Sequence, residues 1–182
     1  MNRTIATTLL MAVTVSMLSA CQVMRTQQNV ANTVQISCSG AESCEFSRLN
    51  DVLIINEKNH KATRDALGRG WIQQRKADDA KKAQNSIYLT VPPQQYEVVV
   101  RFYPISQQHA EVFHVIHDFK PHQQYTFKMF RQRPVRGTGS LLNVSAPSPL
   151  CVDLIRDQKT IRRFCRPYEV MTGLSEYVEQ KL

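Results

Sequence analysis

Apolar and polar residues alternate in several short runs along the chain. This pattern covers 87–91, 96–103, 111–119 and 125–129, and it is typical of strands with one buried face. A continuous apolar run within 49–56 instead indicates a strand covered on both faces. Prolines and other turn residues separate the runs. Short strands separated in this way predict a mainly β protein, folded as an antiparallel sandwich or a small barrel.

Two segments break the alternation and favour short helices. Charges dominate 57–84, where Asp78 and Lys82 stand one helical turn apart, so a helix over 72–84 and a solvated loop are both compatible with the pattern. Near the C-terminus, Thr172 is a suitable N-cap for a short helix over 172–182. We therefore expect one or two short helices beside the strands.

The composition is that of an ordinary globular protein. The 182 residues are 42% apolar and 21% charged, with only 6 glycines and 8 prolines. These values exclude a collagen-like chain, a long coiled coil and wholesale disorder. One domain is the usual organisation at this length, and it can bury a hydrophobic core. We expect this domain to span 34–182.

The N-terminal residues have the features of an export signal. Arg3 precedes a largely apolar stretch over 5–17, which is too short and too rich in hydroxyl groups for a membrane span. The run Leu18-Ser19-Ala20-Cys21 follows directly. This run resembles the lipobox of bacterial lipoproteins, in which the signal peptide is removed and the cysteine thiol receives a lipid. The resemblance implies that 1–20 is a lipoprotein signal peptide and that Cys21 is the lipidated N-terminus.

The same resemblance implies a location. Several acyl chains hold a protein stably at a membrane. In these lipoproteins an Asp directly after the lipidated cysteine favours the inner membrane, whereas Gln22 stands here, so we expect the outer membrane and its periplasmic face. The polar residues of 21–33 then form a tether between the lipid anchor and the folded domain.

The cysteines of the exported chain predict two disulfides. Four remain after the lipidated one, an even number that suits an oxidising compartment: Cys38, Cys44, Cys151 and Cys165. Four cysteines allow three pairings, and the spacing favours joining the first to the second and the third to the fourth. A three-residue turn over 157–159 pairs 156 with 160. Because 151 and 165 share the sum 316 with that pair, their thiols face each other across a hairpin. The spacers do not suit a zinc site.

A second resemblance concerns the strands over 87–129. A strand, a proline-containing turn, a Tyr-x-Val-x-Val strand that starts at Tyr96, and a closing strand with Tyr125 and Phe127 follow one another. This order resembles PEGA and related lipoprotein modules. The resemblance implies a small immunoglobulin-like sandwich that serves as a binding or structural module without catalytic residues.

The sequence holds no recognisable catalytic or metal-binding pattern. His114, His117 and His122 are close in the chain, but 114 and 117 differ by an odd number and so point to opposite faces of a strand. We therefore expect no metal, no other cofactor and no enzymatic activity.

The formal net charge of +8 is concentrated in one segment. Residues 120–166 contain ten basic and two acidic residues, and most of the basic ones are arginines, which recognise carboxylate and phosphate groups with two parallel hydrogen bonds. A solvated face that only aids solubility is the alternative. We expect an anion-binding or partner-binding surface formed by Lys128, Arg131, Arg133, Arg136, Arg156, Arg162 and Arg163.

Together these features predict an outer-membrane-anchored lipoprotein whose periplasmic domain is a noncatalytic binding or envelope-assembly module with a basic surface. Its expected partners are the membrane, through the acyl chains, and an envelope protein complex, anionic lipid or cell wall. Nucleic acid is not expected. A pilotin-like chaperone of a secretion or outer-membrane channel is the alternative, and a metal-dependent enzyme that uses the histidines is the third hypothesis.

Cys21 is expected to carry lipid. Metabolic labelling with a palmitate analogue should mark the wild-type protein and not the Cys21→Ala variant, because the thiol is the lipid acceptor. Equal labelling of both proteins would contradict this prediction.

Overall fold

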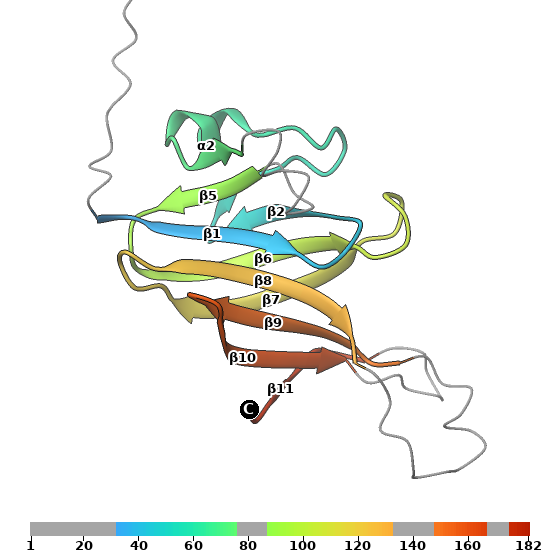
Figure 1. Ribbon diagram of the computed structural model, residues 1–182. Coiled ribbons are helices and arrows are strands. Elements are labelled where there is room, and N and C mark those ends of the chain that lie inside the picture. Colours follow the sequence, from blue (N-terminus) through green and yellow to red (C-terminus); the bar gives the residue numbers. More distant parts are fainter. Residues whose placement is uncertain (1–31, 76–86, 133–147, 167–174) are drawn as a thin grey trace, which may run out of the picture.

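The fold is a sandwich of two β-sheets, which confirms the predicted mainly β architecture (Figure 1). The computed structural model describes residues 32–75, 87–132, 148–166 and 175–182. Sheet A contains, in spatial order, β11 (Val178–Gln180), β10 (Lys159–Arg166), β9 (Leu150–Arg156), β8 (Gln124–Arg131), β1 (Val34–Ser39), β5 (Ile87–Val91) and β4 (Ile72–Gln74). Sheet B contains β3 (Val52–Leu53), β2 (Ser43–Leu49), β6 (Gln95–Tyr103) and β7 (Glu111–Asp118). Within these residues β1 and β8 pair in parallel, and the other neighbours pair antiparallel.

The core lies between the two sheets. Along β8, the side chains of Tyr125, Phe127 and Met129 are at most 1% exposed, while Lys128 points to solvent. Every second residue of β6 from 96 to 102 is likewise buried. The alternation in the sequence therefore marks the inner faces of both sheets, and burial of these faces is the main favourable contribution to folding.

The chain crosses from sheet A to sheet B between β1 and β2. The predicted disulfide between Cys38 and Cys44 is present and joins these two strands, so it links the sheets covalently. The turn contains Gly40 with a φ of +89°, a conformation that side chains rarely adopt. A Cβ atom at this position would lie only 2.0 Å from the carbonyl oxygen of Met129. Glycine is thus needed here both for its backbone conformation and for its small size.

The predicted hairpin is present as β9 and β10, and the Cys151–Cys165 disulfide joins its strands. Its turn is shorter than expected, because Arg156 pairs with Lys159 and not with residue 160. Asp157 and Gln158 form a two-residue loop, and both have positive φ, as a tight hairpin turn requires. A register shift between 160 and 162 adds back the missing residue, so the cysteines still face each other.

The helix expected over 72–84 is wrong at its start. Residues Ile72–Gln74 form β4, and 76–84 lie outside the described residues. Pairing with β5 places Trp71 against Tyr96, with ring centroids 6.3 Å apart, and this long-range packing outweighs a weak helical pattern. The helix of this region is α2 (Arg64–Gly68), which Thr63 caps by accepting a hydrogen bond from the Ala66 amide.

The helix expected over 172–182 is also wrong in its described part, where Val178–Gln180 form β11. Antiparallel pairing with β10 and contacts of Tyr177 and Glu179 hold this segment in an extended form. Residues 172–174 lie outside the described residues. No helix in the described part of the chain is long and apolar enough to cross a membrane.

The strand expected over 49–56 is interrupted. Asn50 takes a φ of 50° and accepts a hydrogen bond from the Glu97 amide, so the chain turns directly after β2. Only Val52–Leu53 form a strand, whereas Ile54 and Ile55 are buried in irregular structure beside β2. The apolar run therefore marks buried positions correctly and strand length incorrectly.

Candidate functional site

The basic residues of 120–166 lie on neighbouring strands, because β8 pairs with β9 and β9 pairs with β10. They do not form one continuous surface. Arg156 stands opposite Tyr125 at one end of the sheet, and Arg131 stands opposite Leu150 at the other end. These positions are six residues apart along β8, which corresponds to about 20 Å.

Arg163 points to the outer face of sheet A, but Asp153 neutralises it. The Arg163 Nε and Nη2 atoms donate to the two oxygens of Asp153 at 2.7 and 2.8 Å. The guanidinium also lies over the Phe130 ring, 5.1 Å from its centroid. The hydrogen bonds to Asp153 raise the pKa of Arg163. Arg163 therefore balances the charge of a nearly buried carboxylate within sheet A.

Arg162 points to the opposite face and joins three elements. It donates to both oxygens of Glu179 at 2.7 Å, and its Nη1 atom donates to the carbonyl oxygen of Ile116 on β7 at 2.9 Å. The guanidinium lies 4.7 Å from the centroid of the Phe164 ring. Its hydrogen bonds to the carboxylate raise the pKa of Arg162 and lower that of Glu179. Arg162 thus links β10 of sheet A to the edge strand β7 of sheet B and to the C-terminal strand β11.

The remaining members of the predicted surface differ in their surroundings. Arg131 donates a hydrogen bond to the carbonyl oxygen of Ser148 at 3.3 Å. Within the part of the chain that the structure describes, four basic residues of 120–166 have no carboxylate at ion-pair distance: Lys128, Arg131, Arg156 and Lys159. Arg133 and Arg136 lie outside the described residues.

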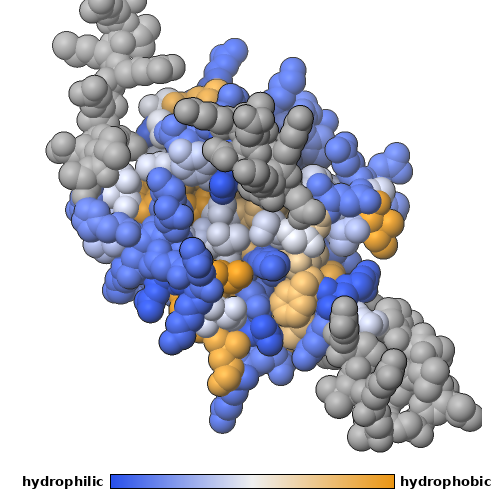
Figure 2. Space-filling model, viewed as in Figure 1, coloured by the Kyte–Doolittle hydropathy of each residue, from blue (hydrophilic) through white to orange (hydrophobic). Residues whose placement is uncertain are grey.

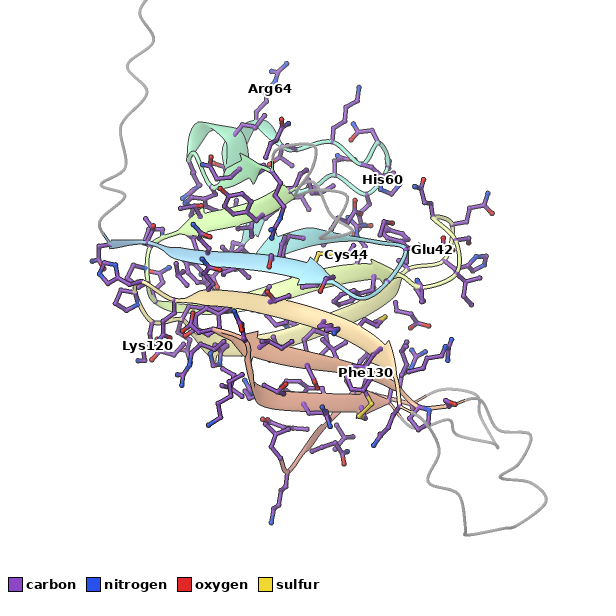
Figure 3. All side chains as sticks on the ribbon, in the orientation of Figure 1. Glu42, Cys44, His60, Arg64, Lys120 and Phe130 are labelled. Atoms are coloured by element: carbon purple, nitrogen blue, oxygen red, sulfur yellow. A yellow bond between two sulfur atoms is a disulfide. The ribbon has the colours of Figure 1, made fainter. Side chains whose placement is uncertain are left out.

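The basic residues of 120–166 lie at both ends of the sandwich. Residue 33 precedes β1 and accepts a hydrogen bond from the His122 amide, so the N-terminal segment attaches at the end where Lys120 lies (Figure 3). β1 runs parallel to β8 from there and ends beside Lys128. Lys128 and Arg131 therefore lie at the end remote from the N-terminal attachment, near Phe130 in Figure 3. On the face nearest the viewer, hydrophilic residues predominate around scattered apolar ones (Figure 2).

His114 and His117 point to opposite faces of β7, as the parity of their positions predicted. His114 lies on the exposed face of β7, with its Nε2 atom 2.8 Å from a Glu97 oxygen. His117 points the other way and packs edge-on against the Phe119 and Tyr125 rings. Burial, assisted by the nearby Arg162 charge, lowers the pKa of His117. The described residues contain no group of three or more side chains suited to a metal ion.

A cluster of titratable side chains on the outer face of sheet B was not anticipated from the sequence. Glu45 is its centre: one carboxylate oxygen accepts a hydrogen bond from the Tyr103 hydroxyl at 2.7 Å and lies 3.1 Å from the Arg101 Nε atom. The other oxygen lies 3.1 Å from the His60 Nδ1 atom. Arg101 also contacts Glu57 at 2.9 Å. We call these five residues the Glu45 cluster.

The Glu45 cluster fastens the loop after β3 to the sheet. The Arg101 side chain is only 7% exposed and donates to the carbonyl oxygen of Ile55. His60, in a left-handed conformation, packs its ring edge-on to Tyr103 with centroids 6.0 Å apart. Burial and the neighbouring Glu45 carboxylate raise the pKa of Tyr103 to about 12, so the hydroxyl stays protonated and acts as a donor. No local pattern in the sequence relates these five residues, so the sequence offered no signal for the cluster.

Comparisons with known proteins identify no relative. No protein family, no curated protein and no solved structure matches the chain. The arrangement of its own residues is therefore the basis for a functional proposal.

Replacing Arg101 with Met should lower the free energy of unfolding by about 3–5 kcal/mol, because the mostly buried Glu45 carboxylate would lose its counter-charge. Arg48→Met is the matched control, since Arg48 forms an exposed ion pair with Glu97 and should cost less than about 1 kcal/mol. Urea denaturation of both variants measures the difference. Similar losses in the two variants would show that the Glu45 cluster is not a stabilising centre.

Proposed function

We propose that this protein is a lipid-anchored module of the bacterial outer membrane, and that its sandwich domain binds an anionic envelope partner without catalysing a reaction. Cys21 would carry the lipid, and 21–33 would be the tether on the periplasmic side. A partner of the cell-wall polymer class would contact the end of the domain where Lys128 and Arg131 lie.

The two disulfides are the observation that carries the proposal. Every cysteine after position 21 is paired, Cys38 with Cys44 and Cys151 with Cys165. Disulfides persist in exported proteins and are rare where glutathione and thioredoxin keep thiols reduced. This pairing supports export, and export is what the charged and then apolar N-terminal residues indicate.

Two of the four basic residues of 120–166 that lack a carboxylate partner in the described part of the chain support an anionic partner away from the membrane. Lys128 and Arg131 lie at the end of β8 remote from the N-terminal attachment of β1. A lipid-anchored domain would present this end to the periplasm. Arg162 and Arg163 hold carboxylates of the chain itself. Arg156 and Lys159 lie at the opposite end, nearer the N-terminal attachment, so Lys128 and Arg131 are the better candidates for contact with polymer.

A protein partner of the pilotin-like kind is the second candidate function. It is favoured by β7, an edge strand of sheet B whose outer face exposes Val112 at 54% and Ile116 at 55%. Exposed apolar residues on a strand edge are typical of surfaces that pair with another chain.

The double charge reversal Lys128→Glu/Arg131→Glu should weaken binding to purified cell wall by a factor of roughly 5–30, the equivalent of 1–2 kcal/mol. The loss should shrink as salt rises, because exposed charges are screened. Pelleting of the full-length protein in detergent with insoluble cell wall measures the bound fraction.

The matched control is Lys58→Glu/Arg64→Glu, which makes the same change in net charge at exposed positions around α2. Equal weakening by both double variants would mean that net charge alone drives association. Unchanged cell-wall binding by the first variant would contradict the proposal of a cell-wall partner.

A further inference from the structure

The C-terminal segment closes one side of the sandwich, next to the edges of β10 and β7. Figure 1 shows β11 at the outer edge of sheet A, beyond β10. Three residue pairs join the two strands, from Arg163 with Gln180 to Cys165 with Val178. We call residues 175–182 the tail, and the four residues that receive its side chains the tail site: Phe113, Arg162, Phe164 and Arg166.

Two tail side chains make the specific contacts. The Tyr177 ring meets the Phe113 ring almost at a right angle, with centroids 5.3 Å apart, and the Arg166 guanidinium lies over the Tyr177 ring, 5.7 Å from its centroid. Two residues later, the Glu179 carboxylate receives the paired hydrogen bonds of Arg162. An extended strand places residues two apart on the same face, so an aromatic residue followed at the second position by a carboxylate is what the site recognises.

The tail site is held in place by groups outside the tail. Arg162 is fixed by the Ile116 carbonyl and the Phe164 ring, and Arg166 is fixed by Glu111, with 2.7 Å between Nη1 and the carboxylate. The Phe113 ring packs against Phe164 with centroids 5.1 Å apart. If the tail leaves, these side chains keep their positions and two guanidiniums remain beside an apolar ring. Such preorganisation lowers the cost of binding another segment.

The tail itself occupies the site imperfectly. All three residues of β11 are exposed, with Val178 at 56%, and the Glu179 side chain is 47% exposed. The Tyr177 hydroxyl is buried and has no hydrogen-bond partner among the described residues. A buried hydroxyl without a partner is unfavourable, whereas a phenylalanine at this position would fill the same space without that cost.

We propose that the tail site is a binding site for an extended segment of a partner protein, with a phenylalanine followed two positions later by Glu or Asp, and that the tail is its internal competitor. The Arg162 guanidinium matches the carboxylate, and the Phe113 ring together with Arg166 matches the aromatic residue. Arg131 lies near this site, because Leu150 pairs with both Arg131 and Arg166 and the Arg131 charge acts on Tyr177. The proposal does not rest on cell-wall binding, since the ion pair that the peptide replaces is made by Arg162.

Because the tail competes for the tail site, a partner segment must bind tightly enough to displace the tail. A segment on the same chain acts at an effective concentration on the order of millimolar. Weakening the tail therefore strengthens binding of an added peptide by the same factor. Strengthening the tail has the opposite effect.

The probe is a fluorescent peptide with the sequence of residues 175–182 in which phenylalanine replaces the tyrosine: Ser-Glu-Phe-Val-Glu-Gln-Lys-Leu. Fluorescence anisotropy with the full-length protein in detergent measures its dissociation constant. Glu179→Gln in the protein should tighten peptide binding about tenfold, because the tail loses its ion pair. Tyr177→Phe should weaken peptide binding roughly fivefold and raise the melting temperature, because the unpartnered hydroxyl is removed.

Controls separate recognition by the site from general charge. In the Glu179→Gln background, Arg162→Lys should reduce peptide binding about tenfold, because lysine cannot make the paired hydrogen bonds. Arg48→Lys in the same background should leave peptide binding unchanged. Equal effects of the two lysine variants would overturn the proposal, and so would absence of peptide binding to every variant.

Discussion

The crossing of the chain between the two sheets is the constraint on which the rest of the fold depends. β1 belongs to sheet A and β2 to sheet B, and only a short turn connects them. Gly40 lets this turn pass directly over the backbone of Met129, and the Cys38–Cys44 disulfide closes it. β1 then lies between β5 and β8 in the middle of sheet A, so its position determines how the later strands assemble.

The arginines act chiefly as internal braces. Acidic residues far away in the sequence neutralise several of them: Glu111 pairs with Arg166, and Glu179 pairs with Arg162. Arg162 in addition satisfies a carbonyl oxygen on the edge strand β7. A charged side chain at a strand edge discourages unwanted pairing with other chains. Residues 120–166 carry a large net positive charge. Ion pairs within the described part of the chain nevertheless leave only a few of these basic side chains available to a partner.

Alternation allowed several strands to be predicted, because each has one buried face. It located β5, β6, β7 and β8 within a residue or two, and cysteine spacing predicted both disulfides. The predicted hairpin paired the two cysteines correctly although its turn was one residue too long. The register shift near Ile161 makes up for that one residue. Parity along a strand likewise predicted that His114 and His117 point to opposite faces.

Features that depend on distant contacts were not predictable from the sequence. β1 and β2 lie on either side of the turn that the first disulfide closes. The residues around its cysteines were interpreted only as a turn, so these two strands were not predicted. The Glu45 cluster combines residues from β2, β6 and the loop after β3, which no local pattern relates. β4 and β11 are short edge strands whose extended form depends on their neighbours and not on their own propensity.

A comparison of two glycine substitutions tests the central role of the crossing most directly. Gly40 and Gly70 both have positive φ, but a Cβ atom at Gly70 would meet nothing within 4 Å. Urea denaturation should show that Gly40→Ala lowers the free energy of unfolding by roughly 2–4 kcal/mol, whereas Gly70→Ala costs about 1 kcal/mol. Equal losses in the two variants would contradict the account, because backbone conformation alone, and not the contact between the crossing and β8, would then explain the requirement for glycine.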